Sequence, residues 1–162
     1  MKFGKVADPS LVDFTLPPTA PETYPVLGIN PKANFEVFVG CAKWNKTDLK
    51  NFYPKGTKDE LMYYSKQFNS IELNATYYSS PSKDQVRIWN DKTPENFKFF
   101  PKIPQSISHY SRLLNTNEKV LTFTDALAFF EDKLGMIFLQ MHENFKPKDF
   151  DRLKHFIESF PK

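Results

Sequence analysis

Hydrophobic and polar positions follow two alternating patterns along the chain from residue 35 onward. Four short runs rich in β-branched and aromatic residues predict buried strands at 36–44, 70–78, 97–104 and 136–141. After each run, apolar residues recur at spacings of three and four, which indicates an amphipathic helix. The predicted order βαβαβαβα specifies a parallel sheet with right-handed crossovers. Four such units fit either a small open doubly wound sheet or half of an eight-unit barrel.

Cap and turn residues mark the ends of the predicted helices. Residues 57–60 (TKDE) and 81–85 (PSKDQ) match capping boxes, in which two side chains satisfy free backbone amides at a helix start. Gly135 stands where the end of a helix favours a residue free to take a positive φ, and Pro147 begins the last helix.

The first 34 residues differ from the rest of the chain. They show no sustained periodicity, and proline both fixes the backbone and removes a hydrogen-bond donor. We therefore expect no helix there, and we assign residues 1–34 to an arm and residues 35–162 to the domain. The arm holds six of the thirteen prolines: Pro9, Pro17, Pro18, Pro21, Pro25 and Pro31.

Composition narrows the class of protein. The chain has 162 residues, 40% hydrophobic and 25% charged, which suits one packed domain and argues against intrinsic disorder. The formal net charge of +3 is too small to demand a nucleic-acid or membrane partner. A single cysteine, Cys41, excludes an intramolecular disulfide framework and a cysteine-rich zinc module. Phosphate-binding GxxxxGK, GxGxxG, GxSxG and HExxH motifs are absent from the sequence, which argues against P-loop NTPases, classical dehydrogenases and α/β-hydrolases.

No segment has the character of a signal peptide, and no run approaches the roughly 20 apolar residues that cross a bilayer. We expect a cytoplasmic protein without a membrane partner.

Polar residues interrupt the predicted strands near their C-terminal ends. In the second strand, Glu72, Asn74 and Thr76 share one parity, while the residues between them are apolar. Lys102 lies on the third strand and Gln140 on the fourth. Folds of this class place ligand sites at these strand ends. Because a buried unpaired charge is costly, we expect Glu72 and Lys102 to be close partners.

Two interpretations of these residues are open. In the functional one, Glu72 is a general acid/base and Lys102 anchors an anionic group, while Asn74 and Gln140 orient the ligand. In the structural one, the same side chains form a polar network that fills the interior.

Histidines and aromatic residues also follow the predicted strands. His109 and the pair His142-Glu143 could reach the same rim as Glu72, and imidazole with carboxylate suits a divalent metal. None of these residues has a diagnostic metal-ligand spacing, so we assign no metal ligand and no cofactor. Aromatic residues, among them Trp44 and Tyr77, also follow the predicted strands. Their rings could stack on bases or sugars of a ligand. Alternatively, they pack as hydrophobic residues in the loops that cover the barrel mouth.

The sequence resembles the YecE-like family, also called domain of unknown function 72. The matching pieces occur in the family's order from about residue 36 to the end: GCAKW (40–44), FYP (52–54), ELNATYYSSP (72–81), Trp89 with TPENFKF (93–99), Lys102, His109 and LGMIFLQ (134–140). The resemblance implies a TIM-type barrel with no established activity. Where many relatives have a proline pair after the glutamine, this chain has Met141 and then His142-Glu143.

The resemblance places the polar residues on motif positions of the family. On this basis we predict catalytic roles for Glu72, Lys102 and His109. We predict ligand contacts for Asn74, Thr76, Tyr77, Gln140 and Trp44. A closed eight-unit barrel typically needs about 250 residues, so we expect a half barrel of about four units.

Three hypotheses follow. The first is an enzyme that acts on a small anionic or phosphorylated compound at the barrel mouth. The second is a nucleic-acid-binding or nuclease-like barrel. The third is a non-catalytic fragment that needs a partner half, because a lone half exposes both flanks of its sheet. The chain would then be a truncated or split product, or a half that associates with itself.

Overall fold

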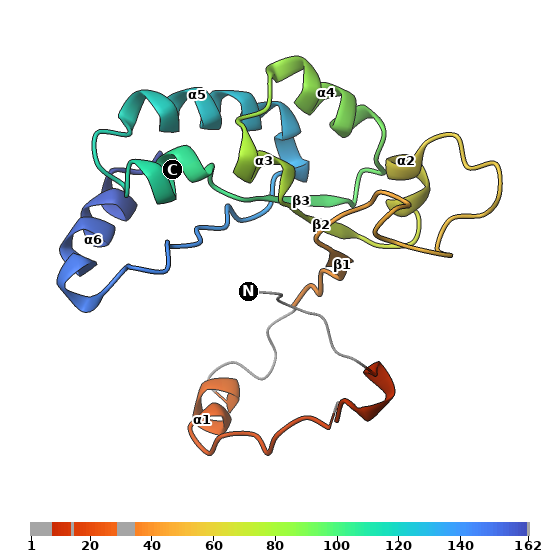
Figure 1. Cartoon of the computed structure of the whole chain (residues 1–162), viewed down its shortest axis with the longest axis horizontal. Coiled ribbons are helices and arrows are strands. Elements are labelled where there is room, and N and C mark those ends of the chain that lie inside the picture. The colour runs from red at the N-terminus through yellow and green to blue at the C-terminus, as the bar shows by residue number, and fades with distance from the viewer. Residues whose placement is uncertain (1–7, 14, 29–34, 162) are drawn as a thin grey trace. The chain divides into compact units, whose positions relative to one another are not determined.

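The computed structural model of the chain describes residues 8–13, 15–28 and 35–161. The chain divides into two units, Met1–Glu36 and Val37–Lys162, and each is described by itself. The second unit contains the sheet and all of the candidate residues (Figure 1). No helix among the described residues is long and apolar enough to cross a membrane.

The first unit contains two short helical segments. They are η1 (Pro9–Leu11), a turn of 3-10 helix, and α1 (Thr23–Gly28). The prediction that the arm has no helix is therefore wrong at these positions. Pro25 lies in the first turn of α1, where a backbone N–H has no partner within the helix and its loss is tolerated. Pro31 lies outside the described residues.

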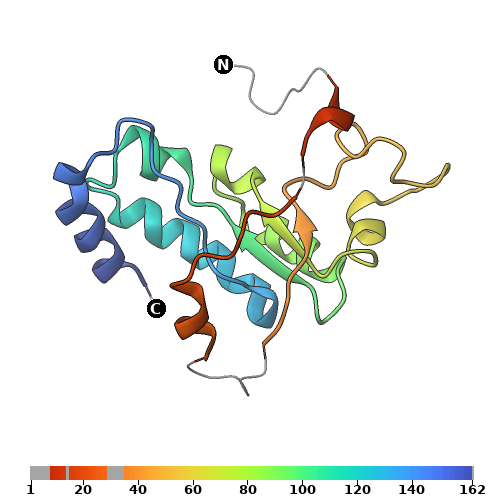
Figure 2. The ribbon, with the colours of Figure 1, turned by 90° about the horizontal axis from the view of Figure 1, so that it is seen from below.

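Three parallel strands form the sheet of the second unit, in the order β1-β2-β3. Their bounds are Gly40–Cys41 for β1, Ser70–Leu73 for β2 and Lys98–Pro101 for β3. Strands that are consecutive in the chain are neighbours in the sheet (Figures 1 and 2). The predicted α/β fold with a parallel sheet is confirmed for these strands.

The first strand is shorter than the predicted 36–44, because an asparagine side chain replaces part of the ladder. The Nδ2 of Asn69 donates to the Val37 carbonyl at 2.8 Å, and its Oδ1 accepts from the Val39 N–H at 2.7 Å. A side-chain amide offers the same donor and acceptor as a peptide group. Asn69 therefore holds residues 37–39 beside the start of β2.

The second strand ends at Leu73, and the prediction of a strand over 70–78 is wrong beyond that point. The chain turns there, with the Asn74 N–H donating to the Glu72 carbonyl at 2.9 Å. The helix α3 (Ala75–Tyr78) follows directly. Asn74 and Thr76 therefore do not continue the alternation that begins at Glu72.

The predicted fourth strand at 136–141 is also absent as a regular strand. Two isolated parallel bridges, Phe99↔Leu134 and Lys102↔Phe138, join this segment to β3. From the first bridge to the second the segment advances four residues and its partner three, so it carries one extra residue. This is the two-against-one pattern of a bulge, which interrupts the ladder.

Gly135 does not have the positive φ that the predicted helix cap requires. Among the described residues, the glycine at positive φ is Gly56. The Gly135 N–H donates to the Phe99 carbonyl at 2.7 Å, and a Cβ on Gly135 would lie 2.6 Å from the Phe100 ring. The absence of a side chain at Gly135 lets the Phe100 ring approach the backbone.

Helical segments connect and follow the strands. Besides α3, the segments are α2 (Glu60–Tyr64), α4 (Lys83–Asp91), the π-helix η2 (Ser106–Tyr110), α5 (Asn117–Leu127), the 3-10 helices η3 (Ala128–Lys133) and η4 (Pro147–Asp149), and α6 (Phe150–Ser159). The Ser82 hydroxyl accepts from the Gln85 N–H at 3.1 Å and caps the helix α4, as predicted. The helix α2 is capped by Asp59, whose carboxylate accepts from the Met62 N–H at 2.9 Å. The predicted cap at Thr57 is therefore wrong.

The core lies between the sheet and the helices α4 and α5, which cover the same face (Figure 1). Phe99 is fully buried there, and its ring stacks on Phe130 with the centroids 4.2 Å apart. The buried Lys133 ammonium donates to the carbonyls of Asn90 and Thr93 at 2.7 and 2.8 Å. A cation at the C-terminal end of α4 also complements the helix dipole.

Candidate functional site

The two charged residues predicted to be partners meet at the C-terminal ends of β2 and β3. The Lys102 Nζ lies 3.7 Å from Glu72 Oε1, and the two side chains are 12% and 42% exposed. The same ammonium lies over the rings of Tyr77 and Phe138, at 5.2 and 5.4 Å from their centroids. Lys102 is therefore a largely desolvated cation, and the predicted Glu72–Lys102 contact is confirmed.

The Thr76 hydroxyl links the backbone at the ends of β2 and β3. The hydroxyl lies 2.8 Å from the Leu73 carbonyl and 2.7 Å from the Lys102 carbonyl, and it accepts from the Lys102 N–H at 3.0 Å. The residue is fully buried. Its polar contacts are thus with the backbone at the ends of two neighbouring strands.

Tyr77 and His109 extend the site on the other side of Lys102. Their rings meet edge to face with the centroids 5.3 Å apart. Burial raises the pKa of the Tyr77 phenol, and the neighbouring Tyr110 and Tyr78 add to this effect. The phenol therefore stays protonated at neutral pH and can donate a hydrogen bond.

His109 lies on η2 and is held by the residue before it. Its Nδ1 is 2.9 Å from the Ser108 hydroxyl, which also lies 3.2 Å from the Pro104 carbonyl. Burial lowers the pKa of His109, and the nearby His142 and Lys102 lower it further. The imidazole is therefore neutral at pH 7, the state in which it can accept a proton.

His142 lies beside His109, with the ring centroids 6.4 Å apart. Its Nδ1 accepts from the Asn144 N–H at 3.1 Å, so in the neutral ring the proton is on Nε2. That Nε2 is buried and has no hydrogen-bond partner among the described residues. In the sequence, the position of His142 directly after the fourth predicted strand indicates only a possible metal ligand, and its unpartnered Nε2 has no sequence signal.

The remaining predicted residues lie at different distances from this cluster. Asn74 directly follows Glu72 and Leu73, and its amide makes no capping hydrogen bond to α3. Gln140 is exposed, two residues after Phe138. Trp44 packs on α4, where its ring meets that of Trp89 edge to face with the centroids 5.9 Å apart. Among the residues that the structure describes, no three His, Cys, Asp or Glu side chains converge as a metal site requires.

Comparison with known families identifies the family of the second unit. The family described as "Protein of unknown function DUF72" matches residues 38–162. The chain belongs to the DUF72 family. The resemblance drawn from the motifs is thereby confirmed over nearly the whole second unit.

Relatives in this family are longer than the chain. The UPF0759 protein YecE of Escherichia coli K12 is 28% identical over 128 residues, which cover 77% of this chain and 44% of YecE. The UPF0759 protein YunF of Bacillus subtilis 168 is 30% identical over 79 residues, or 47% of this chain and 27% of YunF. The chain thus spans less than half the length of the curated relatives it matches.

Crystal structures of a DUF72 family protein from Enterococcus faecalis V583 share the fold. One has a TM-score of 0.61 at 23% identity, over 76% of this chain and 48% of that chain. A second has a TM-score of 0.52 at 25% identity, over 62% and 45%. The parallel α/β arrangement therefore corresponds to about half of a solved DUF72 structure.

Proposed function

We propose that the cluster around Lys102 binds a small anionic compound, and specifically the phosphate of a phosphorylated metabolite. The observation that carries this proposal is the environment of the Lys102 ammonium. It is nearly buried, it lies against two aromatic rings, and its carboxylate partner is 3.7 Å away, beyond hydrogen-bonding distance. Its N–H donors are therefore available to oxygen atoms of a ligand.

Two neighbouring groups support the same ligand class. The Nε2–H of His142 is a buried donor without a partner, and such groups are rare unless a water or ligand satisfies them. The protonated Tyr77 phenol is a further donor next to Lys102. In this proposal the Lys102 ammonium, the His142 imidazole and the Tyr77 phenol each donate to the phosphate, which accepts several hydrogen bonds at once.

In this proposal His109 is the general base of a reaction on the bound compound. We assign the tautomer in which the Ser108 hydroxyl donates to the Pro104 carbonyl and accepts from Nδ1–H of His109, because this leaves the lone pair on Nε2. A neutral imidazole is the usual form of a catalytic base. Glu72, half-exposed at the same mouth, is the second proton-transferring group.

We further propose that the sheet is half of an eight-stranded TIM-type barrel, with this cluster at its mouth. Three consecutive parallel strands and the bridged segment that follows them support this arrangement. Ligand sites in such barrels lie at the C-terminal ends of the strands, where Glu72 and Lys102 are placed.

The proposal is tested by titrating the protein with inorganic phosphate and with a panel of sugar phosphates and nucleoside monophosphates, by calorimetry. Lys102→Met should weaken phosphate binding by about 10- to 100-fold, because a charge-assisted hydrogen bond is lost. Glu72→Gln should strengthen it, because a negative charge next to the phosphate is removed. The control is Lys83→Met, because Lys83 also lies over an aromatic ring, Phe129 at 5.6 Å, but outside the cluster. Equal phosphate affinities for the wild type and Lys102→Met would contradict the proposal.

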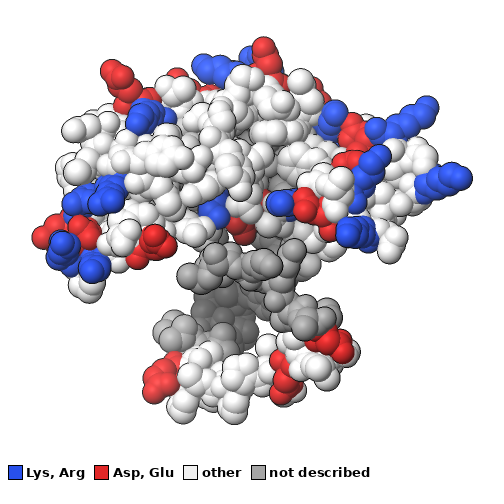
Figure 3. Space-filling model, in the orientation of Figure 1, with Lys and Arg blue, Asp and Glu red and all other residues white. Residues whose placement is uncertain are grey.

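Nucleic acid is the second candidate, and one observation favours it. Tyr78 and Tyr110, 73% and 74% exposed, adjoin Tyr77 and could stack on bases. Against it, the face seen in Figure 3 carries lysine and arginine interspersed with aspartate and glutamate, without a continuous basic surface. Binding of a labelled oligonucleotide that weakens steeply with added salt and is lost in Tyr110→Ala would support this candidate over the phosphorylated metabolite.

A further inference from the structure

The sheet of the second unit has one buried and one open face. Ile71 and Phe99 point toward the helices and are fully buried. Phe38 and Phe100 point to the other face, where their rings meet at 5.6 Å, and Phe138 joins them beside Lys102. Phe38 and Phe138 are 36% and 46% exposed. Parallel sheets occur almost only with both faces covered, so this apolar face needs a cover.

One edge of the sheet also carries backbone groups that face outward. Phe138 donates its N–H to the Pro101 carbonyl at 2.8 Å and accepts from the Ile103 N–H at 2.9 Å. In a parallel ladder the alternate residues face the opposite way. The N–H and C=O groups of Ile137 and Leu139 therefore point away from β3, and they have no hydrogen-bond partner within the described part of the chain.

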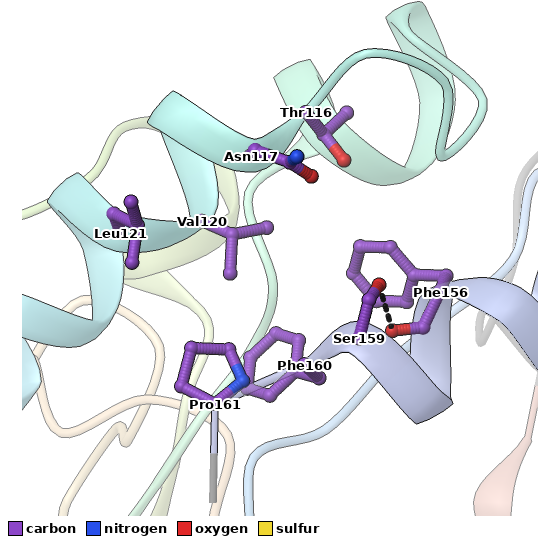
Figure 4. Close-up of a pocket in the computed structure, with 8 residues that line it drawn as sticks. All are labelled: Thr116, Asn117, Val120, Leu121, Phe156, Ser159, Phe160 and Pro161. Carbon is purple, nitrogen blue, oxygen red and sulfur yellow. Dashed lines mark hydrogen bonds between the residues drawn. The ribbon is translucent and has the colours of Figure 1, made fainter.

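An apolar groove lies beside this edge. It has a volume of about 260 Å³ and is formed by the edge itself, by Ile103 and by α6. Figure 4 shows the adjoining hollow, where Phe156 and Phe160 face α5 across the end of α6. Ile157 is 59% exposed at the groove. The edge contributes Ile137 and Leu139, α6 contributes Phe156 and Ile157, and Phe160 directly follows α6.

The opposite edge carries a matching feature. Val37 and Val39 are 60% and 55% exposed, and they share one side of the extended segment because successive side chains alternate. Phe38 between them points to the open face, so the two valines project to the side on which the helices lie. Their backbones are turned toward Asn69, which leaves the N–H and C=O of Phe38 facing outward.

We propose that a second copy of this chain covers the open face. A two-fold axis parallel to the strands places residues 37–41 of each copy beside residues 135–140 of the other, with the strands parallel at both junctions. Val37 and Val39 of one copy then enter the groove beside α6 of the other, and the open faces, with Phe38, Phe100 and Phe138, form a common core. Each edge is used once, so the assembly closes at two copies.

The decisive contact in this arrangement joins Val39 of one copy to Ile157 of the other. Both side chains are more than half exposed in the single chain, so a charge at either position does not disturb its own fold. In the dimer, an unpaired charge in the groove is strongly disfavoured. Two opposite charges, one from each position, restore the contact.

The experiment measures the mass of the full chain in solution by light scattering over a dilution series. The wild type should show twice the chain mass of 18.9 kDa. Val39→Lys and Ile157→Glu, each alone, should raise the dimer dissociation constant by at least about 100-fold, and the double variant should recover the dimer. The matched control is Ile88→Lys, since Ile88 is 48% exposed on α4 away from both edges, and its mass should equal that of the wild type.

A wild type that is monomeric at every concentration overturns the proposal, as does an open-ended series of larger species. A dimer that survives Val39→Lys and Ile157→Glu unchanged also overturns it, because the two copies then meet elsewhere. Circular dichroism of each variant shows that it is folded. The measurement uses no ligand, so its outcome is separate from that of the phosphate titration.

Discussion

Replacement of Thr76 by valine tests whether one buried hydroxyl holds together the strand ends that carry the site. Valine has nearly the same shape as threonine, so the substitution removes the hydroxyl without opening a cavity. The Leu73 carbonyl retains a longer contact with the Lys102 N–H at 3.4 Å. The Lys102 carbonyl loses the partner at 2.7 Å. A stranded, partly buried acceptor costs about 1–3 kcal/mol.

A central value of about 2 kcal/mol corresponds to a fall in Tm of roughly 4–8 °C for a chain of this length. The assay is thermal unfolding of Thr76→Val and of Thr76→Ser, which keeps the hydroxyl and loses only a methyl group. We expect the serine variant to retain the phosphate affinity and the valine variant to lose part of it, because Lys102 is displaced. If the valine variant melts with the wild type, or the serine variant loses phosphate affinity equally, the hydroxyl does not position Lys102.

Three further predictions concern single residues. Lys133→Met should lower the free energy of unfolding by about 2–4 kcal/mol, measured by urea denaturation, because two carbonyls at the end of α4 lose a charged donor. Gly135→Ala should destabilise the chain by about 1–3 kcal/mol in the same assay, because its Cβ meets the Phe100 ring, and Phe100→Leu should reduce that loss. His109 has a lowered pKa in the folded state, so the unfolded chain binds more protons and stability falls as the pH drops from above 6.5 through the lowered pKa. Unfolding of His109→Gln at matched pH values should show a smaller loss over that window, and an identical pH profile would refute the assignment.

The contact between Glu72 and Lys102 could be predicted from the sequence because it depends only on strand order and parity. Two charges near the ends of adjacent parallel strands have few other partners. The role of Thr76 could not be predicted in this way. The segment ELNATYY has the alternation of a strand throughout, and Thr76, just after the turn, is held by hydrogen bonds to Lys102, 26 residues further along the chain. Local pattern does not contain such a tertiary contact.

The segment after Leu134 could be predicted only in part from the sequence. Its apolar run predicted a fourth strand, and the two bridges place the segment beside β3 without a regular ladder. The extra residue between the bridges has no sequence mark, because Met136 and Ile137 suit a bulge as well as a regular ladder. The steric demand of the Phe100 ring on Gly135 is likewise a property of packing across strands. Sequence periodicity therefore predicted an extended segment here, but not its hydrogen bonding.

The proposed dimer and the proposed phosphate site are physically linked, because Lys102 lies on the same face as Phe38 and Phe138. In the single chain, Phe38 and Phe138 are 36% and 46% exposed, so water reaches the apolar surface beside the largely desolvated ammonium and weakens its interactions from that side. A second copy that covers the phenylalanines removes this water and strengthens the attraction of Lys102 for both Glu72 and a bound phosphate. By reciprocity, a phosphate that binds the dimer more tightly also favours the dimer. In this proposal, dimer formation and phosphate binding favour each other, because the surface that the second copy covers, with Phe38 and Phe138, adjoins Lys102.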